Sequence, residues 1–433
     1  MRIAYITAGA AGMFCGSCLH DNTLVSALRK EGHDALLIPT YTPITTDEED
    51  VSLKRVFFGG INVYLQQKFP VFRGTPWFLD RLLDRRWLLN LASRFAVKTD
   101  AKDLGALQVS MLQGEYGPQR KEIEKLLLWL KDEAKPQIIN LTAVLLSGLA
   151  PELKERLGVP ILASLQGDDI FLESLPPPFH GEALSLIRDN ARFIDGFVAT
   201  SHYYADFMAG YLRLPPERIH VVYPGLNLKG HAAETEPAEL RVRQTEPFTI
   251  GYFARICPEK GFHQAVEAFR LLRRQPGAPR CRLRVSGWLG ANHWAFFERE
   301  RKKLEHAGLS ADFEHMESPD HASKVHFLQS LDVLTVPTVY REPKGLYVLE
   351  AWANAVPVVQ PRHGSFPELI EATGGGVLVN PEDPADVARA LRELLENPQR
   401  RAELGRRGLA AVRERFHAAA MAKNTLQVYE KYL

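Results

Sequence analysis

Cysteine, net charge and long apolar runs are all scarce in this 433-residue sequence. Its four cysteines are too few to form a disulfide framework for a chain of this length, so a reducing, cytoplasmic setting is expected. A formal net charge of +1 gives no support for nucleic-acid binding. No stretch approaches the roughly 20 apolar residues of a membrane-spanning helix, and residues 1–9 have the pattern of a first strand rather than of a signal peptide.

The loop after that first strand also lacks the G-x-G-x-x-G fingerprint of dinucleotide-binding proteins. Residues 9–18 contain glycines in a different order, which disfavours a nicotinamide-dependent oxidoreductase. Cys15 and Cys18 form a C-x2-C pair, but no second cysteine or histidine pair follows at metal spacing, so zinc is not expected. We interpret the two as packed thiols in preference to a redox pair.

Alternating strand-like and helix-like patterns fill both halves of the chain, which is longer than one hydrophobic core usually needs. Residues 229–247 are polar and without a clear period, which is typical of a connector. A strand-like run at 248–253 then restarts the pattern. The sequence therefore predicts an α/β fold of two Rossmann-like, doubly wound domains, residues 1–225 and 226–415, followed by a helix in residues 416–433.

The stretch 340–351 carries two carboxylates, Glu342 and Glu350, eight positions apart between a strand-like run and a helix-like run. The amides of Gly345, Leu346 and Tyr347 fall in the first turn of that helix, where free N–H groups favour an anion. Glu350 lies roughly 7 Å further along the helix axis, about the distance from a diphosphate to the ribose of the same nucleotide. This spacing predicts a nucleotide-diphosphate site with Glu342 on the far side of the phosphates.

These residues resemble the E-x7-E signature of the retaining nucleotide-sugar glycosyltransferases of family 4, which have the GT-B fold of two facing Rossmann-like domains. The resemblance implies that Glu342 contacts the donor hexose and that Glu350 contacts the ribose. It also implies that the helix in residues 416–433 crosses back to pack on the first domain. Lys344 stands where the family usually has Phe.

A second match follows the strand at 248–253, where the family has Gly-Arg and then Lys-Gly before a helix. Arg255, Lys260 and Gly261 keep this pattern, although Ala254 replaces the first glycine. A planar guanidinium and a compact ammonium suit a diphosphate, and they would stabilise the leaving group without a metal. The alternative is that Arg255 and Lys260 are two exposed basic loop residues without a ligand. The presence of Glu342 and Glu350 in the same half of the chain disfavours this alternative.

In the first half, Gly16 and His20 match the family's G-G-x-x-x-H loop near the donor diphosphate, with Cys15 in place of the first glycine. His20 is open to two interpretations, a ligand contact or a helix-start residue. Gln166 stands where the family has a His near the transferred sugar, and a glutamine cannot shuttle a proton. Asp168 is equally open, either as an acceptor for a substrate hydroxyl or as a helix N-cap.

Residues 69–98 are aromatic and basic, with six Arg or Lys against two Asp. We favour an amphipathic helix pair packed on its own domain. The alternative is a surface for an acceptor, for a partner chain or for peripheral contact with the inner face of the membrane.

The sequence thus predicts a retaining glycosyltransferase that moves a hexose from a nucleotide-diphosphate sugar to an acceptor hydroxyl, with no cofactor and no metal. Arg255, Lys260 and Glu342 are the predicted catalytic residues. The acceptor, whether a saccharide, a lipid-linked molecule or a small molecule, is not determined. The main alternative is a non-catalytic nucleotide-sugar-binding protein of the same fold.

Overall fold

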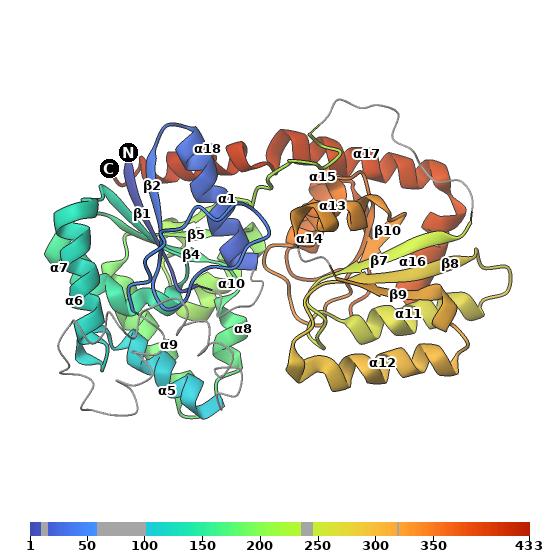
Figure 1. The fold of residues 1–433 in the computed structure, drawn as a ribbon, viewed down its shortest axis with the longest axis horizontal. Helices are drawn as coiled ribbons and strands as arrows, with labels where there is room; N and C mark the ends of the chain where they lie inside the picture. The colour runs from blue at the N-terminus through green and yellow to red at the C-terminus, as the bar shows by residue number, and fades with distance from the viewer. Residues whose placement is uncertain (10–15, 59–100, 235–245, 318–319) are drawn as a thin grey trace. The chain divides into compact units, whose positions relative to one another are not determined.

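The computed structural model describes residues 1–9, 16–58, 101–234, 246–317 and 320–433. The chain separates into two compact units, one formed by Met1–Tyr223 together with Met421–Leu433 and the other by Pro224–Ala420. Each unit contains a six-stranded sheet with helices packed against it (Figure 1). The predicted fold of two α/β, Rossmann-like domains is confirmed. Cys15 and the segment 69–98 lie outside the described residues.

The sheet of the first unit is parallel and has the strand order β2-β1-β3-β4-β5-β6. Its strands are short, and most of their side chains are buried, as expected of a parallel sheet covered on both faces. The strands are β1 (Arg2–Thr7), β2 (Asp34–Pro39), β3 (Ile138–Leu141), β4 (Ile161–Leu165), β5 (Gly196–Ala199) and β6 (Ile219–Val221).

The α-helices of the first unit follow these strands. They are α1 (Gly16–Lys30), α5 (Ala101–Leu112), α6 (Arg120–Trp129), α7 (Ala150–Leu157), α8 (Asp168–Glu173), α9 (Phe179–Asn190) and α10 (His202–Leu212). We expected the first of them to begin at Asp21, but α1 begins at Gly16, so that His20 lies inside the helix. The expected start was too late because only Cys18 of the first four residues of α1 is buried, so the apolar period is weak there.

The end of the chain completes the first unit. Helix α18 (Ala418–Tyr429) begins in the second unit and ends in the first. The Tyr432 hydroxyl lies 2.8 Å from Nε2 of His220 on β6. Tyr432 also packs on Gly196 of β5, where a Cβ would lie only 2.4 Å from the Tyr432 hydroxyl oxygen. The last residues are therefore part of the packing of this sheet.

The sheet of the second unit is also parallel and has the order β12-β11-β10-β7-β8-β9. Its strands are β7 (Phe248–Phe253), β8 (Cys281–Ser286), β9 (Phe313–Met316), β10 (Val333–Thr335), β11 (Val358–Pro361) and β12 (Gly376–Val379). Its α-helices are α11 (Phe262–Arg274), α12 (Trp294–His306), α13 (His321–Gln329), α14 (Leu346–Trp352), α15 (Phe366–Thr373), α16 (Pro384–Glu396) and α17 (Pro398–Arg415).

Each sheet has one point where the strand order reverses. In the first unit, β1 lies between β2 and β3, and in the second unit β7 lies between β8 and β10. Open α/β sheets bind ligands beyond the carboxyl ends of the strands at such a switch point. The loops after β1 and β3, and those after β7 and β10, are therefore the places to look for a site. Among the described residues, no helix is long and apolar enough to cross a membrane.

Candidate functional site

The loops after β7 and β10 pack directly on each other in the second unit. Gly261, which precedes α11, has a φ of +70°, and a Cβ on it would lie 1.7 Å from the carbonyl oxygen of Pro337. Only glycine allows this close approach with a positive φ. The contact brings Lys260, beside Gly261, to the loop that carries Glu342.

Lys260 and Glu342 form an ion pair, with Nζ of Lys260 2.5 Å from Oε2 of Glu342. The Glu342 side chain is buried, and that of Lys260 is 12% exposed. The Tyr340 hydroxyl donates to the same oxygen at 2.5 Å, and the Tyr347 hydroxyl donates to it at 3.3 Å. The other oxygen, Oε1, accepts from the backbone amide of Gly345 at 3.4 Å. The carboxylate is therefore surrounded by donors on both of its oxygens.

Two aromatic rings frame the Lys260 ammonium. Its Nζ lies 4.8 Å from the ring centroid of Tyr340 and 5.2 Å from that of Tyr347. A cation within about 6 Å of a ring face is attracted by the ring quadrupole. Lys260 Nζ also donates a short hydrogen bond to the Tyr340 hydroxyl, so Tyr340 contacts both members of the ion pair through its hydroxyl, and Tyr347 contacts the glutamate through its own.

The charge of Glu342 follows from these contacts. Burial alone would raise the pKa of Glu342, but the Lys260 ammonium and the hydrogen bonds from Lys260, Tyr340 and Gly345 outweigh burial and lower the pKa to about 2. Burial, together with the negative charge of Glu342, raises the pKa of both Tyr340 and Tyr347 well above 10. The carboxylate is therefore ionised at neutral pH, and both phenols remain protonated donors.

The backbone of Glu342 is held by the turn that follows β11. The amide of Ser365 donates to the carbonyl of Glu342 at 2.8 Å. Gly364 has a φ of +60°, and a Cβ there would lie 2.6 Å from both the nitrogen and the oxygen of Glu342. Nε2 of His363 lies 2.9 Å from the carbonyl oxygen of Thr338, in the loop before Glu342. This turn fixes the direction of the glutamate side chain.

Arg255 has a different environment from Lys260. Its side chain is exposed, and its guanidinium makes no hydrogen bond or ion pair with a described residue. Its backbone carbonyl accepts from the Tyr252 hydroxyl at 3.1 Å. On Tyr340, where burial and Glu342 raise the pKa, the positive charge of Arg255 acts in the opposite direction. The arginine is therefore close to the cluster without being tied to it.

Glu350 lies further along α14 and is itself buried. Nζ of Lys324, on α13, lies 2.9 Å from Oε1 of Glu350, and both side chains are almost fully buried. Asn354 donates to the backbone carbonyl of Glu350 at 2.9 Å. Leu346 is the first residue of α14, which begins immediately after Gly345. The helix thus places Tyr347 beside Glu342 and places Glu350 beside a lysine that the sequence did not single out.

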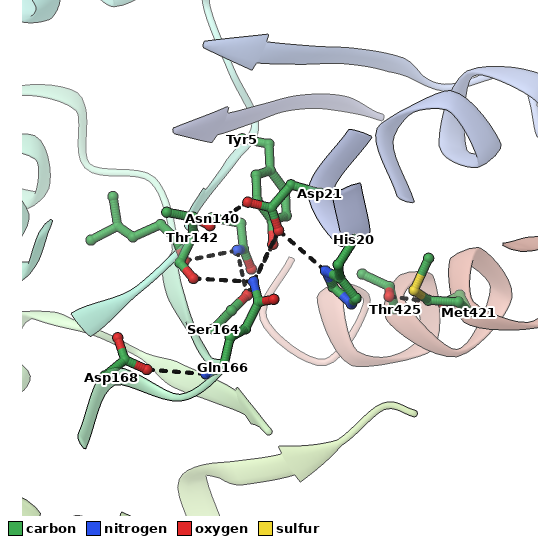
Figure 2. Close-up of polar contacts among 11 residues, drawn as sticks. Tyr5, His20, Asp21, Asn140, Thr142, Ser164, Gln166, Asp168, Met421 and Thr425 are labelled. Carbon is green, nitrogen blue, oxygen red and sulfur yellow. Dashed lines mark hydrogen bonds and ion pairs between the residues drawn. The ribbon is translucent and has the colours of Figure 1, made fainter. Parts of the chain in front are cut away.

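In the first unit, the residues predicted on the sugar side meet around Asp21 of α1, which is fully buried (Figure 2). Its Oδ1 lies 3.1 Å from Nδ1 of His20, 2.9 Å from Nε2 of Gln166 and 3.0 Å from the Tyr5 hydroxyl. Its Oδ2 accepts a short hydrogen bond from the Thr142 hydroxyl. His20 and Gln166 are thus brought together, by a residue that had been taken only as the start of a helix.

Two further predicted residues lie elsewhere in this unit. Oδ2 of Asp168 accepts from the backbone amide of Gln166 at 3.0 Å, at the start of α8. Asp168 is the first residue of α8 and not its N-cap, which is Gly167 without a side-chain cap, so the N-cap interpretation of Asp168 is wrong. Gly16 is the exposed first residue of α1.

Two family models match the chain. Residues 234–410 match the model described as glycosyl transferases group 1, and residues 109–229 match the model described as glycosyltransferase family 4. The chain is also 30% identical over 302 residues to the D-inositol 3-phosphate glycosyltransferase of Paenarthrobacter aurescens (strain TC1), covering 66% of this chain and 70% of that protein. The chain belongs to the GT-B glycosyltransferases.

Solved structures agree with this glycosyltransferase fold over the whole chain. The sucrose-phosphate synthase of Thermosynechococcus elongatus superposes with a TM-score of 0.70 at 16% identity, covering 100% of this chain and 99% of that one. The HepE protein of Anabaena, in complex with UDP, superposes with a TM-score of 0.69 at 15% identity, covering 100% of both chains. At such identities the likeness concerns the fold alone.

Sequence reasoning missed several residues of the glycosyltransferase that the structure places around Glu342, Glu350 and Asp21. Tyr340 opens the predicted stretch, but only its contact with Glu342 shows that its hydroxyl faces inward. Lys324, Asp21 and Thr142 gave no sequence signal, because charged and polar residues of this kind usually lie on helix surfaces and in loops. The burial of a charged side chain can be predicted only when the residue that pairs with it is known.

Proposed function

We propose that this glycosyltransferase is a retaining, metal-independent hexosyltransferase that uses a nucleotide-diphosphate sugar as donor. The observation that carries the proposal is the cluster of Lys260, Glu342, Tyr340 and Tyr347 at the switch point of the second sheet. Its glutamate is ionised and its lysine lies next to the glutamate. The glutamate can therefore orient a sugar, and the lysine can bind a phosphate. The structure of HepE with UDP makes a uridine nucleotide the first donor to test.

In this mechanism the donor diphosphate binds Lys260 and Arg255, whose side chain is exposed and makes no hydrogen bond or ion pair with a described residue. The amides of Gly345, Leu346 and Tyr347 add donors to the phosphates. Glu350 accepts hydrogen bonds from the ribose hydroxyls.

The reaction replaces one bond with another at the anomeric carbon. The bond from that carbon to the diphosphate oxygen breaks, and the acceptor hydroxyl forms its new bond on the same face of the sugar. The departing diphosphate takes the proton of the acceptor, and the cations stabilise the charge that builds on it. Glu342 orients the hexose during this exchange. The identity of the acceptor follows from none of these contacts.

The test is a panel of UDP-, GDP- and ADP-sugars in which nucleotide release is followed with Glu342→Ala and Lys260→Ala. Each variant is expected to lose at least about 100-fold in kcat. Surface variants Glu414→Ala and Lys302→Ala serve as matched controls and should retain turnover. The anomeric configuration of the product, measured by NMR, tests retention, and turnover in the presence of a chelator tests metal independence.

A non-catalytic sugar-binding protein would give a different result. It would bind a nucleotide sugar without releasing nucleotide, with or without an acceptor. Gln166, in place of a histidine, and Cys15, in place of a glycine, are the residues that keep this alternative open. Unchanged turnover in both the Glu342 and the Lys260 variant would instead remove the site assignment.

A further inference from the structure

The loop between β7 and α11 carries both of the cations that we propose for the donor diphosphate. We propose that Tyr252, on β7, is a positioning residue whose hydroxyl holds the backbone of Arg255 and Lys260 at the separation that a diphosphate needs. The proposal rests on the proposed function for its ligand class. Its structural basis is one buried hydroxyl within hydrogen-bond distance of both backbone carbonyls.

The hydrogen bonds of this hydroxyl can have only one direction. The Tyr252 hydroxyl lies 3.1 Å from the carbonyl oxygen of Arg255 and 3.3 Å from that of Lys260. A carbonyl oxygen only accepts, so the single hydrogen of the phenol is shared between the two oxygens. Burial, as the largest cause, raises the pKa of Tyr252 well above 10, so the phenol keeps this hydrogen. Tyr252 therefore joins the two ends of the segment 255–260 through one donor.

The ring of Tyr252 is held independently of its hydroxyl. The residue is fully buried, and its strand β7 is hydrogen-bonded between β8 and β10. Its ring lies edge-on to that of Phe262, the first residue of α11, with the two centroids 5.4 Å apart. Tyr252→Phe should therefore remove the hydroxyl and leave this packing in place.

Arg255 depends on its backbone for its position. Its side chain is exposed and makes no hydrogen bond or ion pair with a described residue. Its carbonyl oxygen, by contrast, accepts from the Tyr252 hydroxyl and lies 3.7 Å from Sγ of Cys257. The direction in which the guanidinium leaves the loop is therefore set by the backbone that Tyr252 holds.

Lys260 differs from Arg255 because its side chain is held as well. Its ammonium is paired with Glu342 and donates to the Tyr340 hydroxyl. Loss of the Tyr252 hydroxyl should therefore move Arg255 more than Lys260. This difference between the two cations gives the proposal a specific signature.

The middle of the loop is fixed by its neighbours on both sides. The amide of Ile256 donates to the carbonyl of Trp288 at 2.9 Å, and the amide of Val339 donates to the carbonyl of Glu259 at 3.0 Å. These two contacts hold the loop against the loops after β8 and β10, whereas Tyr252 holds its two ends relative to each other. Binding of a diphosphate by two cations requires such a fixed separation, because the two phosphoryl groups are themselves linked.

The first measurement needs no ligand. Backbone amide hydrogen exchange is compared between wild type and Tyr252→Phe in the full-length protein. Exchange in residues 255–261 is expected to become about tenfold faster, the effect of one lost hydrogen bond, while exchange in β7 stays unchanged. Tyr41→Phe is the matched control, since it removes a hydroxyl that donates to Gln119 at 2.6 Å in the first unit. Unchanged exchange of the loop in Tyr252→Phe would overturn the proposal whatever the protein catalyses.

The second measurement is a double-mutant cycle on the Kd of UDP, determined by calorimetry. Tyr252→Phe is expected to weaken UDP binding roughly tenfold, and Tyr41→Phe by less than about twofold. Because Tyr252 acts through Arg255, adding Tyr252→Phe to Arg255→Ala should weaken binding by no more than about twofold further. A hydroxyl that only stabilised the fold would have the same effect in both backgrounds.

The opposite results are equally clear. If Tyr252→Phe leaves the Kd of UDP unchanged, or weakens binding as much in the Arg255→Ala background as in wild type, Tyr252 does not position Arg255. If Tyr252→Phe does not fold, the wild-type hydroxyl proton is observed by NMR. A slowly exchanging signal with NOEs to both ends of the segment 255–260 supports the proposal, and its absence overturns it.

Failure of the proposed function would be recognised separately. If the wild-type protein binds inorganic pyrophosphate but not UDP, the same cycle is measured with pyrophosphate. If it binds neither, the proposed donor site fails, and hydrogen exchange alone decides whether Tyr252 holds the loop.

Discussion

Nζ of Lys260 and Oε2 of Glu342 lie 2.5 Å apart although the two residues are separated by 82 positions in the sequence. Glu342 is buried and Lys260 is largely buried, and the loops that carry them meet because Gly261 has no side chain at the contact with Pro337. Breaking a buried ion pair leaves an uncompensated charge, so each partner depends on the other.

Replacing Lys260 alone therefore tests the pair. Lys260→Met should lower the free energy of unfolding by about 3–5 kcal/mol, measured by chemical denaturation, because Glu342 is left buried without its counter-charge. The double variant Lys260→Met/Glu342→Gln should recover most of this loss and yet remain inactive. A double variant as unstable as the single one would show that the two side chains are not coupled.

The stability of the protein should depend on pH through Glu342. Its pKa is lowered from 4.5 to about 2 in the folded protein, so its stabilising effect is complete above about pH 4.5 and is lost as the pH falls toward 2. The effect corresponds to about 3 kcal/mol. Unfolding free energies of wild type and Glu342→Gln, measured from pH 6 to pH 2, should converge as the pH falls. Glu414→Gln, an exposed control, should run parallel to wild type.

The two tyrosines around Glu342 should differ in importance. The Tyr340 hydroxyl lies 2.5 Å from Oε2 and the Tyr347 hydroxyl lies 3.3 Å from it. Tyr340→Phe should cost about 1.5–3 kcal/mol of unfolding free energy, as expected for a hydrogen bond to a charged group, and Tyr347→Phe less than that. Equal losses, or a larger loss for Tyr347→Phe, would contradict the geometry.

Gly364 and Gly308 offer a matched pair of substitutions. Both have positive φ, +60° and +70°, but a Cβ on Gly364 would lie 2.6 Å from the backbone of Glu342, whereas Gly308 has nothing within 4 Å. Gly308→Ala should cost only the strain of a left-handed residue, about 1–2 kcal/mol. Gly364→Ala should cost about 1–3 kcal/mol more and should also impair turnover, because the backbone of Glu342 must shift. Similar losses of unfolding free energy for the two variants would mean that the turn at Gly364 can shift at little cost in free energy.

Two lysine–glutamate pairs in the second unit differ in the exposure of the lysine. Both glutamates are buried, and Glu300 also has Arg299 3.3 Å away. Lys324 is 6% exposed beside Glu350, whereas Lys303 is 42% exposed beside Glu300. Lys324→Met should lower the unfolding free energy by about 3–5 kcal/mol, and Lys303→Met by no more than about 1 kcal/mol. Lys324→Met should also weaken UDP binding, measured by calorimetry, if Glu350 holds the ribose. A Lys324 variant as stable as the Lys303 variant would place the first pair in contact with water.

The sequence was sufficient for the fold and for part of the second-unit site. Alternation of apolar strands and helices is local, and so is the spacing of Glu342 and Glu350 on either side of a helix start. Lys260 and Glu342 were both predicted at the donor site, but their direct contact was not, and only the structure shows it. The catalytic roles of these residues stay predictions.

The first-unit site could not be predicted in the same way. The partners of Asp21 stand 16, 121 and 145 positions from it, at Tyr5, Thr142 and Gln166, and periodicity carries no information over such separations. The start of α1 was also misplaced, since only Cys18 of its first four residues is buried and gives no period by itself. Burial of polar side chains depends on partners that only the folded sheet supplies.

The position of Tyr429 has a consequence for biosynthesis. Its side chain is fully buried beside the Asp21 network, although it is made after the whole of the second unit, Pro224–Ala420. At translation rates of about 5–20 residues per second, the ribosome adds that unit in roughly 10–40 seconds. During this interval the nascent first unit lacks the segment that closes one side of it. The surface around Asp21 can therefore be closed by Tyr429 only after the second unit has been synthesised.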